Sequence, residues 1–198
     1  EIAQRLKTES VIEVTGKVAA RSAETVNPKT HRITVRCELA NGDGRLKPEM
    51  YATLDLCGAE LPVDRPRYLM GVGFPDDLIE GVRRGMDLFD CVAPTRMGRH
   101  GTAFTPRGTV QLQKSTHRLD RSPLVEGCPC PACTHYDRAY LRHLFAAEEP
   151  LGPRLIALHN LTLLVGLMRD ARTAILGGDF DRWSDDWLRE YRATDATR

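Results

Sequence analysis

Three closely spaced cysteines are the residues of this chain whose types and spacing most clearly imply chemistry. They lie in the run Cys-Pro-Cys-Pro-Ala-Cys, as Cys128, Cys130 and Cys133. Thiols this close in sequence cannot easily pair with one another, but they can converge on one metal ion. Structural zinc sites take a tetrahedral set of Cys and His ligands. The cluster therefore predicts a structural Zn²⁺ site that needs a fourth ligand.

A histidine would complete this ligand set, and three candidates follow the cysteines. His135 is adjacent in sequence but closely tethered, His143 lies on the next predicted helix, and His159 lies on a later one. Spacing alone gives none of them a clear lead.

Asp90 is the best candidate for a catalytic group, because it lies near the end of the apolar segment 86–93. A carboxylate among apolar residues is costly unless it is paired or functional. In parallel sheets, ligands bind at the carboxyl ends of the strands. The alternative is a buried acid that orders a loop. Asp87 competes for the role, but it lies at the start of the same strand, which indicates a structural position.

A basic segment follows directly, from Thr95 to Arg121. It carries six cations against the single acid Asp120. Such a segment suits a phosphate backbone, although a solvated basic loop fits the charge equally well. Its position just after Asp90 favours the first interpretation.

The elements expected to position these residues form an α/β unit. Residues 68–73 and 86–93 read as short strands, the second closed by Pro94, and residues 75–84 read as a helix that begins at Pro75. Strand, helix and strand with short joins predict a parallel pair. Later helices follow, one opening at Pro153 and a short peripheral one in 179–198. Residues 1–57 read as a small β-rich segment with alternating stretches and turns.

Composition gives no sign of a membrane or of a strongly charged partner. The 198 residues carry a formal net charge of +1, which gives no global attraction to nucleic acid or membrane. No apolar run is expected to approach the roughly 20 residues that span a bilayer, and the first residues lack a signal-peptide core. Cys37, Cys57 and Cys91 are expected to be reduced and buried. We therefore expect a cytoplasmic protein with no membrane partner.

Several motifs in one order carry a resemblance to a known family. They are the stretches 65–73 (RPRYLMGVG), 87–96 (DLFDCVAPTR), 101–105 (GTAFT), 128–133 (CPCPAC), 138–141 (RAYL) and 159–160 (HN). Residues from about 61 to 192 resemble the C-terminal half of the tRNA-guanine transglycosylases, also called queuine tRNA-ribosyltransferases. Residues 1–57 do not resemble this family.

The resemblance implies the C-terminal part of a (β/α)8 barrel over residues 58–198, with a zinc-binding subdomain at about 122–175. It implies a pentosyltransferase that exchanges the wobble guanine of tRNA for a 7-deazaguanine base, a queuosine precursor, through a covalent Asp–ribosyl intermediate. Asp90 would be the nucleophile and Met70 would pack on the bound base. The zinc ligands would be Cys128, Cys130, Cys133 and His159.

The same resemblance implies two RNA-binding segments and the partners of the protein. The segments are Gly71, Val72, Gly73, Phe74, Pro75, Asp76 and Asp77, and Thr95, Arg96, Met97, Gly98 and Arg99. The partners would be a tRNA with a wobble guanine, the 7-deazaguanine base and a second copy of the chain in a homodimer. The alternative is a catalytically inactive, zinc-stabilised fragment for tRNA binding or dimerisation. Few parallel strands are expected here, and they cannot close an eight-stranded barrel.

Overall fold

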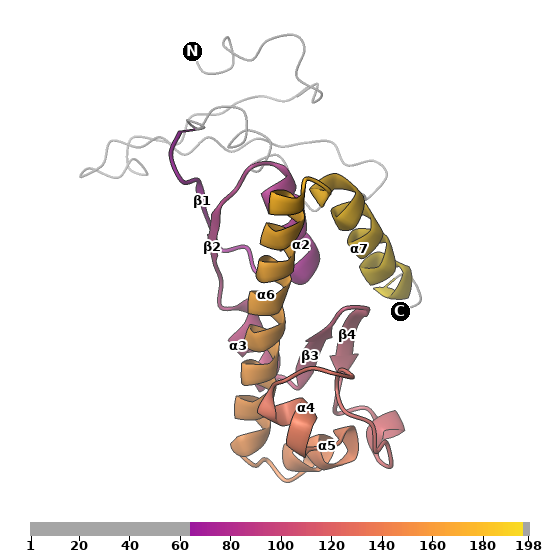
Figure 1. Ribbon diagram of the computed structural model, residues 1–198. Helices are drawn as coiled ribbons and strands as arrows, with labels where there is room; N and C mark the ends of the chain where they lie inside the picture. Colours follow the sequence, from indigo (N-terminus) through magenta and orange to yellow (C-terminus); the bar gives the residue numbers. More distant parts are fainter. Residues whose placement is uncertain (1–63, 196–198) are drawn as a thin grey trace, which may run out of the picture. The chain divides into compact units, whose positions relative to one another are not determined.

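One long helix, α6 (Leu151–Gly177), organises the structure. The structure is a computed structural model that describes residues 64–195. The chain divides into two units, 1–61 and 62–198. The strands expected in residues 1–57, with Cys37 and Cys57, lie outside the described residues. Figure 1 shows the other elements of the second unit arranged along the length of α6.

A short parallel strand pair lies beside the C-terminal half of α6. Strand β1 (Tyr68–Met70), helix α2 (Pro75–Arg83) and strand β2 (Leu88–Asp90) follow one another. The strands pair in parallel with Met70 opposite Asp90, which confirms the expected βαβ unit. Helix α2 begins with Pro75, whose missing N–H costs nothing in a first turn. Leu78 of α2 is buried together with Phe104 and with Leu164 of α6.

The basic segment after β2 is folded rather than being a continuous loop. It forms helix α3 (Ala93–Arg99), the antiparallel hairpin of β3 (Thr102–Thr105) and β4 (Gly108–Gln111), and the short helix η2 (Ser115–His117). The expectation that Pro94 closes a strand was wrong, because β2 ends at Asp90 and Pro94 lies in the first turn of α3. Proline is well tolerated there.

A second core surrounds the cysteine cluster at the N-terminal half of α6. Helices α4 (Pro131–His135) and α5 (Arg138–Ala146) pack there against α6 (Figure 1). The side chain of Asp137 caps α5 by accepting a hydrogen bond from the N–H of Tyr140. The buried side chains of this core come from β3, α4, α5, α6 and the segments between β4 and α4: Ala103, Leu112, Leu124, Cys130, Ala132, Leu141, Leu144, Leu155 and Ile156.

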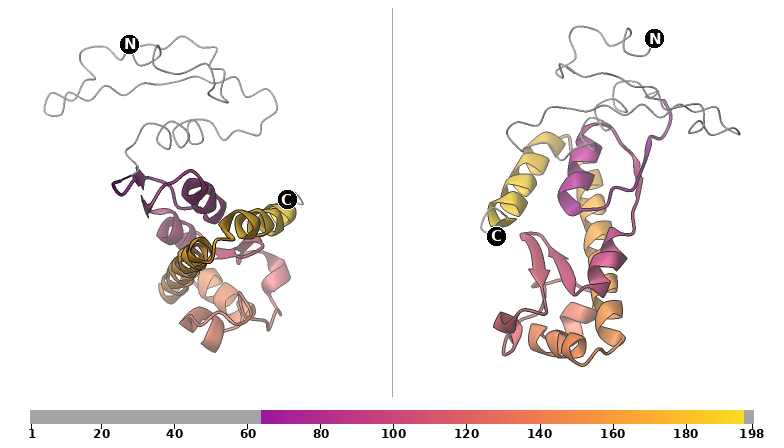
Figure 2. Two further views of the ribbon diagram at one scale, coloured as in Figure 1. Left: turned by 45° about the horizontal axis from the view of Figure 1, so that its top comes forward. Right: turned by 180° about the vertical axis from the view of Figure 1, so that it is seen from behind.

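Helix α7 (Phe180–Asp195) closes the other end of the unit. The expectation of a short peripheral helix was wrong, since α7 has 16 residues and packs against α2 and α6. Both views of Figure 2 show it beside them. Leu188 is buried with Ile79, Leu167 and Ala171, and Trp183 and Trp187 pack around this group. Its many charged residues lie on the remaining faces.

Helix α6 also corrects the expectation about apolar runs. By length and composition this helix of 27 residues, which contains an 18-residue stretch with a mean hydropathy of 1.4, could cross a membrane. The core helix of a soluble protein passes the same test. Here α6 buries the polar side chains of His159 and Asn160, and it packs against α3, α4, α5 and β3.

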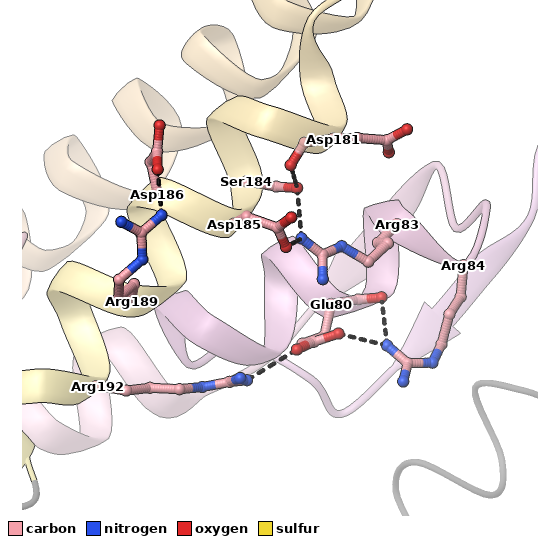
Figure 3. Close-up of polar contacts among 9 residues, drawn as sticks. All are labelled: Glu80, Arg83, Arg84, Asp181, Ser184, Asp185, Asp186, Arg189 and Arg192. Carbon is pink, nitrogen blue, oxygen red and sulfur yellow. Dashed lines mark hydrogen bonds and ion pairs between the residues drawn. The ribbon is translucent and has the colours of Figure 1, made fainter.

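Ion pairs and hydrogen bonds join α7 to α2 (Figure 3). The carboxylate of Glu80 on α2 accepts hydrogen bonds from Arg84 at 2.5 Å and from Arg192 of α7 at 2.9 Å. Burial raises the pKa of Glu80, but these two guanidinium groups outweigh it, so the pKa is lowered overall. Arg83 donates to Ser184 and Asp185 at 2.6 Å each. Glu80 is therefore charged at neutral pH and fastens α7 to α2.

Replacing Glu80 with Gln should lower the free energy of unfolding at pH 7 by about 1–2 kcal/mol, because two charge-assisted hydrogen bonds weaken. The folded-state pKa of Glu80 lies below its unfolded value of about 4.3, so its stabilisation is complete above that pH and is lost as pH falls through the folded pKa. The difference in unfolding free energy between wild type and Glu80→Gln, measured by urea unfolding, should therefore be smaller at pH 3 than at pH 7. The control is Asp186→Asn, whose exposed partner Arg189 lies on the same helix. An equal loss at both pH values would contradict the role of the Glu80 charge.

Candidate active site and metal centre

The strand pair presents Asp90 on an open face. Residues directly opposite in β1 and β2 share a face, so Met70 lies beside Asp90, and Tyr68 and Leu88 lie on that same face. All four side chains are exposed, Met70 by 70%. Leu69, on the other face, is buried. The expectation of an acid embedded in apolar surroundings therefore does not describe Asp90, which stands at the carboxyl end of β2 among large exposed side chains.

A backbone amide holds the carboxylate of Asp90. The N–H of Gly71 donates to the Asp90 carbonyl oxygen at 2.8 Å, and it lies 3.3 Å from Oδ1 of the same residue. Gly71 has a φ of +81°, which a glycine adopts without strain and other residues rarely do. The turn after β1 thus positions both the backbone and the carboxylate of Asp90.

Tyr68 is a site residue that the sequence reasoning missed. Local desolvation and the neighbouring Asp90 carboxylate raise the pKa of Tyr68 above its ordinary value. The hydroxyl therefore stays neutral to a higher pH than that of an ordinary tyrosine. The period of two in a strand could have found it, because it places residues 68 and 70 on one face.

Replacing Asp90 with Asn should lower the pKa of Tyr68 toward the ordinary value of about 10, because the negative charge is lost. The measurement is an NMR titration of tyrosines labelled at the Cζ carbon, with Tyr68→Phe to identify the resonance. Tyr140→Phe serves as a control that leaves the Tyr68 titration unchanged. A Tyr68 pKa that is the same in wild type and in Asp90→Asn would show that the two groups do not interact.

The segment from Gly71 to Asp77 exposes only part of its length. Gly71 and Phe74 are exposed and Asp76 is half-buried, while the remaining members are buried: Val72, Gly73, Pro75 and Asp77. An ideal Cβ on Gly73 would lie 2.4 Å from the Cβ of Cys91, so only glycine fits beside the residue that follows Asp90. The assignment of this segment to RNA contact stays a prediction, and its accessible atoms are mainly those of Gly71 and Phe74.

The second predicted RNA segment lies on α3. Arg96 and Arg99 are exposed there, and Thr95 and Met97 are half-buried. Gly98 is buried against α6, where an ideal Cβ would lie 2.7 Å from the backbone nitrogen of Ala157. This close approach seats α3 on α6 and leaves its two arginines facing outward, directly after the strand that carries Asp90.

The four residues proposed as metal ligands come together in the structure. Nδ1 of His159 lies 3.3 Å from the sulfurs of Cys130 and Cys133 and 3.8 Å from that of Cys128. The four ligand atoms lie within 4.8 Å of one another, so the cluster could hold a metal ion. His135 and His143 are exposed and stand outside it. His135 instead contacts Oγ1 of Thr134 at 2.8 Å.

Hydrogen bonding prepares His159 to act as a ligand. Its Nε2 lies 2.8 Å from the carbonyl oxygen of Phe104, so Nε2–H donates and the lone pair of Nδ1 faces the thiols. Burial lowers the pKa of His159 and favours the neutral ring, which is the form that binds metals. Burial also raises the pKa of the Cys130 and Cys133 thiols. The residues present therefore fit a cation, and its binding would release thiol protons.

Hydrogen bonds to Asp120 hold the loop that precedes the three cysteines. Asp120 accepts hydrogen bonds from the Ser122 backbone at 3.0 Å and from Arg138 at 3.3 Å, and His117 lies 3.3 Å from it. Although burial raises the pKa of Asp120, these partners lower it overall to about 2. The acid that interrupts the basic segment is thus a charged anchor for the loop before the metal centre.

The strand pair, the carboxylate and the Cys3His cluster define the class of protein: an α/β protein with an acid at the carboxyl end of a parallel strand and a cluster that could hold a metal ion. The family comparison is more specific. The family model described as queuine tRNA-ribosyltransferase matches residues 16–193, and the chain belongs to this family. The match reaches into residues 16–57, which we had expected to fall outside the family.

Curated relatives agree with this assignment. The chain is 51% identical over 155 residues to the queuine tRNA-ribosyltransferase of Novosphingobium aromaticivorans, covering 78% of this chain and 41% of the relative. It is 48% identical over 149 residues to that of Herpetosiphon aurantiacus, covering 75% of this chain and 38% of the relative. With the Deinococcus radiodurans relative it shares 49% identity over 148 residues, 75% of this chain and 38% of the relative. The chain thus spans about two fifths of the length of these relatives.

Proposed function

We propose that this chain carries the nucleophile, tRNA-contacting segments and metal centre of a tRNA-guanine transglycosylase. The observation that supports it most directly is the Asp90 carboxylate, held by the Gly71 amide at the end of a parallel strand in a member of this family. The exposed carboxylate is oriented so that it can attack a sugar. The exposed apolar side chains beside it can pack against the base of that sugar. Met70, directly opposite Asp90, would supply that packing surface.

The reaction splits one displacement into two. An Asp90 carboxylate oxygen attacks C1′ of the ribose at the wobble guanosine, the bond from C1′ to N9 breaks, and guanine leaves with its electron pair and takes up a proton. The ribose is then an ester of Asp90. A 7-deazaguanine base attacks C1′ through its own ring nitrogen, loses the proton on that nitrogen, and restores the carboxylate. The target nucleotide must leave the base stack to reach the strand end.

We propose Zn²⁺ as the metal at the Cys3His cluster. Typical zinc bonds of about 2.3 Å to sulfur and about 2.05 Å to nitrogen, at a tetrahedral angle, separate the two ligand atoms by about 3.6 Å. The separations between Nδ1 of His159 and the three sulfurs, from 3.3 to 3.8 Å, bracket this value. When bound, the ion would hold α4 against α6 and supply no chemistry to base exchange.

The arrangement also supports the finer fold assignment. A parallel strand pair joined by α2, with α6 packed behind it, suits the C-terminal part of a (β/α)8 barrel. In such a barrel the open face of Tyr68, Met70, Leu88 and Asp90 would point inward. The metal-binding helices form the zinc subdomain, and the protein would act on cytoplasmic tRNA as a homodimer.

One observation favours the alternative of an inactive zinc-stabilised module for tRNA binding or dimerisation. In the described part of the chain the parallel sheet has two strands, and the face that carries Asp90 is open. Tyr136 and Tyr140 also stack on the surface of the metal subdomain, with ring centroids 5.1 Å apart, and could contact a second copy.

The deciding experiment incubates the purified chain with labelled guanine and a tRNA that carries a wobble guanine. The matched control is the same tRNA with a wobble adenine. Incorporation of label into the first tRNA alone, with a covalent protein–tRNA species on denaturing gels, supports the enzyme. Binding of tRNA without incorporation would support the tRNA-binding module, and absence of both would refute the enzyme and the tRNA-binding module alike.

A further inference from the structure

Asn160, next to the ligand His159 on α6, is fully buried, and its side-chain amide is fully used. Its Oδ1 accepts a hydrogen bond from the N–H of Phe104 at 2.8 Å. Its Nδ2 donates to the carbonyl oxygens of Pro94 at 3.0 Å and Thr102 at 3.1 Å. A buried amide with its donors and acceptor satisfied can take only one orientation, and it fixes the groups that it contacts.

Phe104 connects this amide to the metal centre. Its carbonyl oxygen accepts from Nε2–H of His159 at 2.8 Å, while its N–H donates to Asn160. Two consecutive side chains of α6 therefore hold both backbone groups of one residue of β3. Since Nδ1 of His159 faces the three sulfurs, the orientation of its ring depends on the metal centre on one side and on β3 on the other.

Pro94 connects the amide to α3. It lies in the first turn of that helix, four residues after Asp90, and α3 carries the exposed Arg96 and Arg99. Gly98 of α3 also packs closely on Ala157 of α6. One of the contacts that attach α3 to α6 is thus a hydrogen bond from the residue beside the proposed metal ligand.

We propose that Asn160 is a positioning residue that makes the placement of α3 depend on the filled metal centre. Metal binding fixes the His159 ring, the ring and Asn160 together fix β3 at Phe104, and Asn160 fixes Pro94. The position of Arg96 and Arg99 relative to Asp90 follows from this link. The consequence for tRNA rests on the proposed function, whereas the link itself does not.

The test compares hydrogen exchange in the zinc-loaded and zinc-stripped full chain by mass spectrometry. Stripping should speed exchange of the hydrogen-bonded amides in α3 and directly after it, residues 96–101, by about tenfold or more, while peptides of α7 keep their protection. Unchanged exchange in α3 would overturn the proposal. Equal loss of protection in α7 would also overturn it, because the metal would then hold the whole unit together rather than α3.

The variant Asn160→Asp separates the two halves of the link. Aspartate keeps the acceptor for the Phe104 N–H but lacks both donors. The zinc-loaded variant should therefore still hold one zinc per chain. Its α3 amides should nevertheless exchange as fast as those of zinc-stripped wild type. Loss of the zinc would show that Asn160 supports the ligand set itself, and would overturn the proposal. Gly98→Ala, which displaces α3 without touching the amide, is the positive control for exchange in α3.

A binding readout distinguishes this proposal from the proposed function. If both hold, stripped wild type and loaded Asn160→Asp should lose affinity for an anticodon stem-loop RNA to the same extent, about tenfold, with little further loss when Asn160→Asp is stripped. A large further loss would mean that metal and amide act separately, against the proposal. An RNA that fails to bind even loaded wild type would refute the proposed function, and the exchange experiment would still decide the link.

Discussion

Replacing His159 with Ala should reduce bound zinc from about one ion per chain to less than about a tenth after dialysis against a weak chelator. Metal binding in structural sites contributes on the order of 10 kcal/mol to folding, and the loss of one ligand from a set of four removes much of it. The substitution also leaves the buried carbonyl of Phe104 without its donor, which costs about a further 1–3 kcal/mol. Thermal unfolding should therefore begin in the metal subdomain at a much lower temperature.

Two further variants separate metal loss from loss of packing. Cys130→Ser should lose zinc but keep the hydrogen bond of His159 to Phe104. His143→Ala, on the exposed surface of α5, should keep both zinc and stability. Zinc content is measured by plasma emission and stability by calorimetry. Retention of zinc in His159→Ala together with its loss in His143→Ala would overturn the ligand assignment.

Replacing Asp90 with Asn should abolish the covalent protein–tRNA species and slow base exchange by at least about 10³-fold, because an amide oxygen is a poor nucleophile. The variant should fold as wild type does. Asp90 is exposed, and the Asn Oδ1 can still accept from the Gly71 N–H, so stability should change by less than about 0.5 kcal/mol.

Asp87 supplies the matched control, three residues earlier in the chain. Its Oδ2 accepts a hydrogen bond from the N–H of Arg67 at 2.8 Å, and an Asn there keeps the acceptor. Asp87→Asn should therefore form the covalent species at close to the wild-type rate. Loss of the covalent species in Asp87→Asn but not in Asp90→Asn would reverse the assignment of the nucleophile.

The sequence predicted elements whose signals are local. Pro75 and the acids after it mark the start of α2, and the φ of +74° at Gly178 explains why the double glycine ends α6. The helix α3 was missed because its sequence contains Pro94 and Gly98, which do not signal a helix. Gly98 allows α3 to pack closely on Ala157 of α6. That contact joins residues about 60 apart in the chain, so no local pattern indicates it.

The candidate site shows the same division. The three cysteines are close in sequence and predicted their cluster, while the choice among His135, His143 and His159 needed the family resemblance. The structure adds the physical reason, which is that the carbonyl of Phe104 orients the ring of His159. Helix α7 was underestimated because its charges outnumber its apolar residues, although Trp183, Trp187 and Leu188 cover one face.

The link through Asn160 is made almost entirely to backbone atoms. The groups that its side chain contacts are the N–H of Phe104 and the carbonyl oxygens of Pro94 and Thr102. Every amino acid carries a backbone carbonyl, so selection can exchange the side chains at positions 94 and 102 without breaking the link. Covariation between alignment columns would therefore miss it: position 160 would stay fixed while its partners drift, and only coordinates would reveal that they belong together.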